Sequence, residues 1–297
     1  MGVYVAPPAP DVSELLTRWQ LDLLLVPILF IAVAYVVGVR RLAERGRAWP
    51  RRRTASFLGG LAVIVIATES GLAAYDRVLF SMHVVQHLLL GLVAPLLLVL
   101  GAPVTLALQA GSRACQTHLL RVLHSRPVTL LTHPVTAWFL FGGTMVALYF
   151  SGLYELSLRN EWVHAAVHLH FVVVGFVFLS YVVGIDPIVR ALSYGARLLF
   201  VLIALPFHAF VGVALLGTDH LLAAGWYHQV VRSWGSSPLA DQRTGAGILW
   251  AFGELFGLVA AIVVVAQWMR HEERAAARHD RLLTSNTAGS EIAGTHG

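Results

Sequence analysis

Two pairs of histidines are the residues of this sequence whose type and spacing best suit chemistry. His83 and His87 occur in the segment HVVQH, and His164 and His168 occur in HAAVH. In a helix, residues four apart lie on one face about 6 Å apart along the axis, so each pair can reach one metal ion. Imidazole nitrogen is a good ligand for copper, zinc, iron and nickel. The four histidines are therefore predicted metal ligands.

The two pairs belong to a short internal repeat. The tripeptide Ser70–Leu72 precedes the first pair and the identical tripeptide Ser151–Leu153 precedes the second, with every matching residue offset by 81 positions. Duplicated units are a common way to build a membrane protein with a site between the copies. We therefore expect the two histidine-bearing helices to face one another.

Deeper ionisable residues extend this candidate site. His208, in LPFHAF, and Glu254, in WAFGEL, each lie nine residues into an apolar run, which corresponds to a depth of about 14 Å in a helix. An ionisable residue at such a depth normally faces the bundle interior and has a partner. We expect His208 to be a further metal ligand and to pair with Glu254. Asp241, in the loop above them, and Met82, a soft sulfur ligand for Cu(I), are predicted supporting residues.

The elements that position these residues must be membrane helices. Of the 297 residues, 57% are hydrophobic and only 12% are charged, and the mean hydropathy is +0.72. Several apolar runs reach the roughly 20 residues needed to cross a bilayer as a helix. The predicted fold is an all-α, polytopic membrane bundle of about seven helices. The expected spans are near residues 21–39, 54–70, 82–108, 130–150, 162–184, 196–217 and 245–268.

The arginines predict the orientation of this bundle. All 21 basic residues are arginine, and 16 of them, Arg190 included, fall in segments on one side of the predicted spans. Because cytoplasmic loops retain positive charge, the N-terminus is expected outside and the C-terminus in the cytoplasm. Residues 1–20 then form a short external segment, 21–270 the seven-helix transmembrane domain, and 271–297 a partly disordered cytoplasmic tail.

Several classes of function are excluded by the composition. The net charge of +5 is spread between apolar runs and forms no patch with interleaved aromatic residues, so no nucleic-acid partner is expected. The single Cys115 excludes an intramolecular disulfide, a CxxC clamp and a CxxCH haem attachment. The chain has no GxSxG, Walker or HExxH motif, so we do not expect an enzyme.

The chain resembles a known family, the CtaG-type cytochrome c oxidase assembly factors of bacterial cell membranes. The resemblance covers approximately residues 20–275 and is carried by RRTASFLGGL, LFSMHVVQHLLLGLVAPLLLVLGAPV, WVHAAVHLHF before GIDP, and LADQRTGAGILWAFGEL. It implies a multi-pass protein of the bacterial cell membrane that helps to mature a haem-copper terminal oxidase. The polar positions of the family pattern correspond to His83, His87, His168, His208 and Asp241.

The resulting hypothesis is an assembly factor that binds copper through the histidines and helps to deliver it to the catalytic subunit of cytochrome c oxidase. Its expected partners are that subunit and the lipid bilayer, and a homo-oligomer is left open. The alternatives are a membrane cytochrome with bis-histidine haem ligation, a copper transporter, and a metal-free scaffold for the oxidase.

Overall fold

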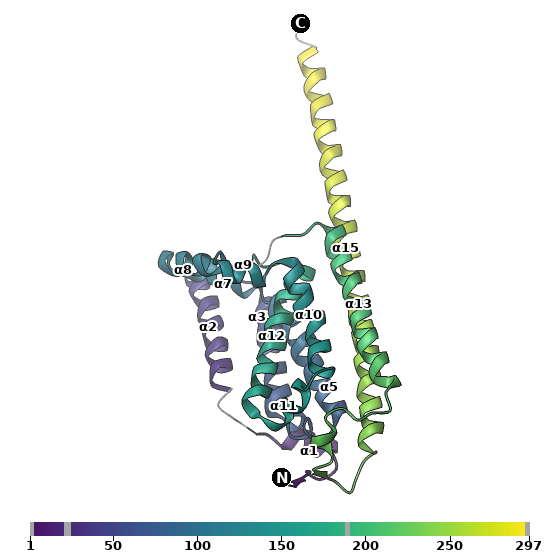
Figure 1. Ribbon diagram of the computed structural model, residues 1–297. Coiled ribbons are helices and arrows are strands. Elements are labelled where there is room, and N and C mark those ends of the chain that lie inside the picture. The colour runs from purple at the N-terminus through teal and green to yellow at the C-terminus, as the bar shows by residue number, and fades with distance from the viewer. Residues whose placement is uncertain (1–2, 21–24, 188–190, 295–297) are drawn as a thin grey trace.

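Long apolar helices run between the two ends of the molecule. The computed structural model describes residues 3–20, 25–187 and 191–294. Within these residues six segments are long and apolar enough to cross a membrane: Leu25–Glu44 (α2), Arg51–Tyr75, Phe80–Ala110, Glu161–Val183 (α12), Tyr194–Gly217 (α13) and Pro238–Arg278. A seventh crossing results if Pro134–Tyr149 (α10) and Leu153–Arg159 (α11), bent by 73° across a short break, count as one span. The predicted all-α, multi-pass fold is confirmed (Figure 1).

The remaining elements are short or subdivide these spans. Residues 21–24 of the predicted first span, Arg190 and residues 295–297 lie outside the described residues. Strands β1 (Tyr4–Val5) and β2 (Val230–Val231) form one parallel pair. The other helices are α1 (Val12–Thr17), α3 (Arg51–Glu69), α4 (Gly71–Tyr75), α5 (Phe80–Leu88), the π-helical η1 (Leu89–Val93), α6 (Ala94–Leu100), α7 (Pro103–Ala110), α8 (Arg113–Leu123), α9 (Arg126–Leu131), α14 (Ala224–Tyr227) and α15 (Pro238–Gly294).

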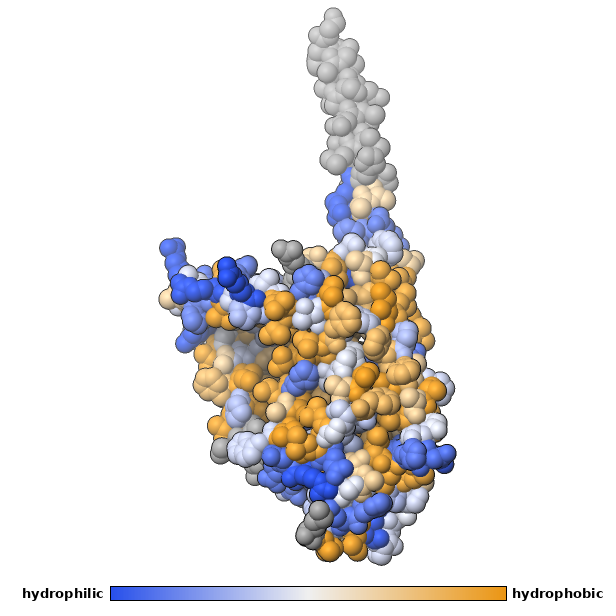
Figure 2. Space-filling view, in the orientation of Figure 1, coloured by the Kyte–Doolittle hydropathy of each residue, from blue (hydrophilic) through white to orange (hydrophobic). Residues whose placement is uncertain are grey.

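The surface has the banding of a membrane protein. Apolar residues cover the middle of the bundle and hydrophilic residues lie toward its two ends (Figure 2). Large apolar side chains such as Leu255, Val259 and Ile262 are exposed along α15. Helices α7, α8 and α9 lie at the end from which α15 projects, whereas α1 and α11 lie at the opposite end (Figure 1). The direction in which this bundle crosses a membrane stays a prediction.

The internal repeat is visible in the order of the helices. In each copy a long helix (α3 or α10) is followed by a short one (α4 or α11) and then by a histidine-bearing helix (α5 or α12). The histidine-bearing helices begin at Phe80 and Glu161, 81 residues apart, which is the offset of the sequence repeat. The two copies therefore present their histidines at equivalent positions.

Two glycines bring the histidine-bearing helices together. Pro95 has no N–H to donate to the carbonyl one turn earlier, and the preceding residues Leu89–Val93 form a π-helical turn. A Cβ placed on Gly175 of α12 would lie 2.2 Å from the Gly91 carbonyl oxygen of that turn and 2.9 Å from Pro95 Cγ. The absence of a side chain at Gly175 is thus what allows this close backbone approach.

The start of α15 differs from the predicted start of the seventh span. The helix begins at Pro238, seven residues before the expected position 245. The Ser237 hydroxyl accepts a hydrogen bond from the Ala240 N–H (3.3 Å), and proline is favoured in a first helical turn. Asp241 therefore lies in the first turn of α15, not in the loop expected from the sequence.

Candidate metal centre

Each histidine pair lies on one face of its helix. Helix α12 is started by Asn160, whose side-chain oxygen accepts from the N–H groups of Trp162 (2.9 Å) and Val163 (3.2 Å). The ring centroids within a pair are 4.0 Å apart for His83 and His87 and 4.2 Å apart for His164 and His168. The i, i+4 spacing thus places both rings of each pair side by side.

The two pairs also face each other across the helix interface. The ring centroids of His83 and His164 are 5.7 Å apart, and those of His87 and His168 are 5.5 Å apart. His83, His87 and His164 are buried, whereas His168 is partly exposed. The structure brings together all four histidines that the sequence repeat had paired; we call them the four-histidine cluster.

The first turn of α5, which positions His83, is capped by a carboxylate from a helix that is distant in the sequence. The residue before this helix is Leu79, which cannot cap it. Asp241 of α15 supplies the missing acceptors: its Oδ1 accepts from the Ser81 hydroxyl (2.5 Å) and its Oδ2 lies 3.3 Å from the Ser81 backbone N–H. A carboxylate at a helix N-terminus satisfies a free N–H and complements the helix dipole. Asp241 thus fixes the first turn of α5, two residues before His83.

The described residues offer two overlapping sets of three ligands. Ligand atoms of His83, His87 and His164 all lie within 4.8 Å of one another, and so do those of Asp76, His164 and His168. His164 belongs to both sets. We call the first, fully buried set the inner set and the second the outer set. Asp76 precedes α5 and is buried, so a carboxylate joins the histidines from outside their helices.

The cluster contains buried polar atoms that the protein leaves without hydrogen bonds. Among the described residues, both ring nitrogens of His83 and of His87, Nε2 of His164 and Oδ1 of Asp76 have no hydrogen-bond partner. His164 Nε2 lies 3.4 Å from Asp76 Oδ2, close enough for an ion pair but without hydrogen-bond geometry. Buried polar groups are normally satisfied. Imidazole and carboxylate groups that converge without partners fit a bound metal ion.

Asp76 is held in an environment that disfavours its charge. It lies between the segments Arg51–Tyr75 and Phe80–Ala110, outside both. Burial raises the pKa of its carboxyl to about 7, and the neighbouring Arg77 guanidinium offsets this only in part. A cation coordinated by Asp76 would compensate the cost of burying the carboxylate.

A cavity of about 330 Å³ connects the cluster with the surface. Its walls include buried Asp76 and Gln86 as well as exposed Gln20 and Glu161. His164 and His168 line it, whereas His83 and His87 are not among the described residues that do. A second, apolar cavity of about 250 Å³ lies between α2, α3 and α12 and is also lined by His168.

Comparison with known families decides what kind of protein carries this site. The family described as cytochrome c oxidase caa3 assembly factor (Caa3_CtaG) matches residues 33–271. The chain belongs to this family. It is a multi-pass membrane protein of a bacterial assembly-factor family, as the sequence resemblance had implied.

Similar proteins occur in mycobacteria. Uncharacterized proteins of Mycobacterium bovis and Mycobacterium tuberculosis are each 38% identical to the chain over 300 residues, and one of Mycobacterium leprae is 35% identical over 297 residues. Each match covers 97% of this chain but 45% of the relative. The chain thus spans about half the length of the curated relatives it matches. No solved structure matches the chain significantly.

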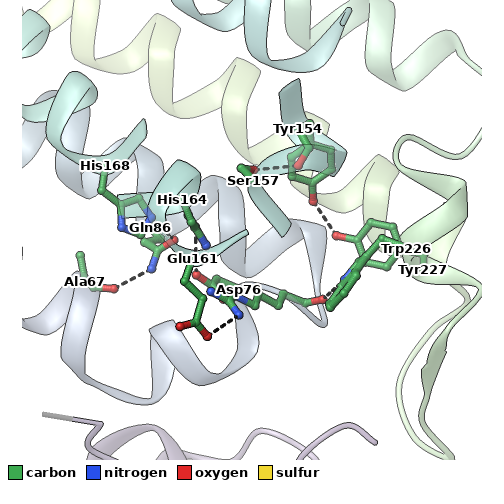
Figure 3. Close-up of polar contacts among 11 residues, drawn as sticks. Ala67, Asp76, Gln86, Tyr154, Ser157, Glu161, His164, His168, Trp226 and Tyr227 are labelled. Atoms are coloured by element: carbon green, nitrogen blue, oxygen red, sulfur yellow. Dashed lines mark hydrogen bonds and ion pairs between the residues drawn. The ribbon is translucent and has the colours of Figure 1, made fainter. Parts of the chain in front are cut away.

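Sequence reasoning missed two polar residues of this candidate site. One is Asp76, and the other is Gln86, whose Nε2 donates to the Ala67 carbonyl (2.8 Å) and whose Oε1 lies 3.1 Å from His168 Nε2. Figure 3 shows His164 directed at Asp76 and His168 directed at Gln86. With its amide oxygen facing His168, Gln86 accepts from Nε2–H and leaves Nδ1 of that ring as the nitrogen for a metal. Gln86 lies three residues after His83, on the same helical face, which is the signal that could have revealed it.

An aromatic wall closes the other side of the inner set. The Tyr154 ring packs edge-on against His83 with centroids 4.8 Å apart, and its hydroxyl lies 2.6 Å from the Tyr227 hydroxyl. The Phe171 ring lies 4.4 Å from that of His87. Figure 3 shows the Tyr154–Tyr227 contact joining α11 to the segment around α14. These rings fix the histidine rotamers by packing.

The structure does not bring every predicted site residue into the cluster. His208 belongs to neither ligand set, although it shares a small internal cavity with His87. The predicted pairing of His208 with Glu254 is not observed: no hydrogen bond joins the two side chains among the described residues, and His208 Nε2 and Glu254 Oε1 are buried without partners. Gly253 packs closely against the His208 ring. Successive residues of a helix are rotated by about 100° about its axis, so Glu254 points in a different direction from Gly253. Met82 is half-buried next to His83, and its predicted role stays untested.

Proposed function

We propose that this chain binds copper through the four-histidine cluster and supplies it to a haem-copper cytochrome c oxidase during assembly. The observation that carries the proposal is the convergence of four imidazoles from two helices, with buried ring nitrogens that no described residue satisfies. The family description names the caa3 oxidase as what its members help to assemble. The identity of the metal and the act of delivery are proposals for this chain.

The donor set favours copper among the metals of such an oxidase. Neutral imidazoles suit copper and avoid the cost of burying charged ligands within a membrane. The single Cys115 is exposed on α8, at the end of the bundle opposite α11 (Figure 1), and belongs to neither ligand set, so the proposal involves no thiolate ligand. Asp76 is the only carboxylate in the two ligand sets found among the described residues.

The packing around the cluster speaks against the haem alternative. Bis-histidine haem ligation needs a flat macrocycle between two facing rings. Here the rings of Tyr154 and Phe171 already lie against His83 and His87, and within each pair the two imidazoles are in contact. A metal ion fits this arrangement, whereas a porphyrin would require the two helices to separate.

The position of His168 supports delivery. Together with Thr68 and Ala165, this residue lines both the polar cavity and the apolar cavity between α2, α3 and α12. It is also the one histidine of the cluster that is not fully buried. A ligand shared by both cavities suits the passing of an ion to a partner within the membrane.

The test is complementation of a bacterium from which the equivalent family gene has been deleted. We expect the wild-type chain to restore cytochrome c oxidase activity and oxidase copper in membranes. The double variant His87→Ala with His168→Ala removes one ligand from each set. It should restore less than about a tenth of the oxidase activity that the wild-type chain restores, because even the loss of residues that support metal ligands typically costs about 10–100-fold. Full rescue by the double variant, at equal protein level, would favour the metal-free scaffold instead.

A further inference from the structure

The two ligand sets differ in how an ion can reach them. The outer set of Asp76, His164 and His168 lies on the wall of the 330 Å³ cavity, which extends to exposed Glu161. The inner set of His83, His87 and His164 is fully buried, and neither His83 nor His87 is among the described residues that line that cavity. An ion arriving through the cavity therefore meets the outer set first.

His164 connects the two sets. It is the only member common to both, and its ring lies 5.7 Å from that of His83 and 4.2 Å from that of His168, centroid to centroid. A neutral imidazole carries a proton on one ring nitrogen and has a free lone pair only on the other, so a neutral His164 coordinates one ion at a time. The sets are thus alternative positions for a single ion.

The two sets also differ in their ligands. Those of the outer set suit the entry of an ion, and those of the inner set suit its retention. Asp76 brings a carboxylate with a buried, unpartnered Oδ1 to the outer set, and a negative ligand attracts a hydrated cation and helps to replace its water. The inner set is composed only of neutral imidazoles behind the aromatic wall of Tyr154. It offers three nitrogen ligands away from water.

We propose that Asp76, His164 and His168 form an entry position for the copper ion, from which it moves by ligand exchange about His164 to a holding position at His83, His87 and His164. The oxidation state of the ion does not change in this step: bonds to Asp76 and His168 are replaced by bonds to His83 and His87. This inference rests on the proposed copper-binding function, and it adds a ligand, Asp76, and an order of events.

The test follows the uptake of Cu²⁺ by metal-free, detergent-purified full-length protein. Stopped-flow mixing gives the association rate, and equilibrium dialysis with electron paramagnetic resonance gives the capacity and ligand type. Asp76→Asn keeps the size of the side chain but removes the anionic ligand, and His168→Gln removes the outer set by a second route. Both leave the inner set complete. Asp219→Asn is the matched control, because Asp219 is an exposed carboxylate that pairs with Arg243 (2.7 Å) and belongs to neither set.

We expect the wild type and Asp219→Asn to take up one Cu²⁺ per chain at the same rate. Asp76→Asn and His168→Gln should keep that capacity but take up the ion at least tenfold more slowly, and Asp76→Glu should recover most of the rate. His87→Ala should bind one ion with fewer nitrogen couplings in its spectrum, since only the outer set remains. Size-exclusion profiles establish that each variant is folded.

Two results would overturn the entry position: wild-type uptake rates in both outer-set variants, or two Cu²⁺ ions bound at once to the wild type. If instead the wild type takes up no copper in either oxidation state, the proposed function itself fails and the entry position fails with it. Normal uptake together with unchanged rates in Asp76→Asn and His168→Gln leaves the copper-binding function intact and removes only this inference.

Discussion

The imidazole rings of His87 and His168 lie 5.5 Å apart, centroid to centroid, although they belong to different copies of the repeat. Their equivalents one turn earlier, His83 and His164, are 5.7 Å apart. The near equality of these distances follows from two helices that begin at equivalent positions of the repeat and from the close approach of their segments at Gly91 and Gly175. Two repeated segments that each carry two histidines thus bring four imidazoles into one cluster.

The close approach at Gly175 predicts a sensitive position. A methyl group there would lie 2.2 Å from the Gly91 carbonyl oxygen, so the helices bearing the histidines would have to separate. We expect Gly175→Ala to destabilise the protein by about 1–3 kcal/mol or more, the cost of overpacking, and to weaken copper binding. Thermal unfolding in detergent measures the first effect and a copper titration the second.

Gly143→Ala is the matched control for that substitution. Gly143 lies in α10 with nothing within 4 Å of the added Cβ, so alanine there should be neutral or stabilising by up to about 1 kcal/mol. Equal stability of the two variants would contradict the account of the helix interface.

Gln86 is expected to orient His168 for metal binding. Its side chain joins the Ala67 carbonyl to His168 Nε2, and Gln86→Leu removes both contacts without a large change in size. Loss of such an orienting partner typically weakens metal binding by about 10–100-fold, and we expect this loss in the His87→Ala background, where only the outer set remains. The measurement is competition for copper against a chelator of known affinity. Gln116→Leu, which removes a bond to the Leu108 carbonyl at the other end of the bundle, should leave copper affinity unchanged.

Asp241 is predicted to stabilise the helix that carries His83 and His87. Asp241→Ala removes the acceptors for the Ser81 hydroxyl and N–H, and losing a helix-capping carboxylate costs about 0.5–2 kcal/mol. We expect a lower unfolding temperature and faster hydrogen exchange in the first turn of α5. Asp219→Ala, which breaks only an exposed ion pair, should change neither quantity. A normal exchange rate at Ser81 in Asp241→Ala would argue against this role.

His208 is expected to lie outside the copper-binding set. Because it belongs to neither group of converging ligands, His208→Ala should keep the copper content of the wild type and lose stability only, through the gap left beside Gly253. Metal analysis of the purified variant checks this. A copper content that falls as far as in the double variant His87→Ala with His168→Ala would restore His208 to the site.

The sequence predicted the parts of this molecule that depend on local pattern. Apolar runs indicated the membrane helices, and the spacing within each histidine pair indicated a shared face. The 81-residue offset between Ser70–Leu72 and Ser151–Leu153 indicated that the pairs would meet, since duplicated helices tend to pack together. These features need no knowledge of which helix contacts which.

The parts that it did not predict arise from packing between distant segments. Asp76 reaches His164 only through the turn between α4 and α5 (Figure 3), and the equivalent residue in the second copy is Ser157, so the repeat gave no hint of a carboxylate. Asp241 was expected in a loop because the apolar run begins later than the helix that carries it. His208 and Glu254 share a depth, but the rotation of two different helices decides whether their side chains meet.

The copper content of the purified chain tests the central claim most directly. Full-length protein is purified in detergent after growth with added copper, and copper per chain is measured by mass spectrometry in the wild type, in the double variant His87→Ala with His168→Ala, and in the control His170→Ala. His170 lies on α12 two residues from His168 but bonds Thr144 outside the cluster. We predict one copper per chain in the wild type and control and almost none in the double variant. Equal copper in all three proteins, or none in the wild type, would contradict a four-histidine copper site.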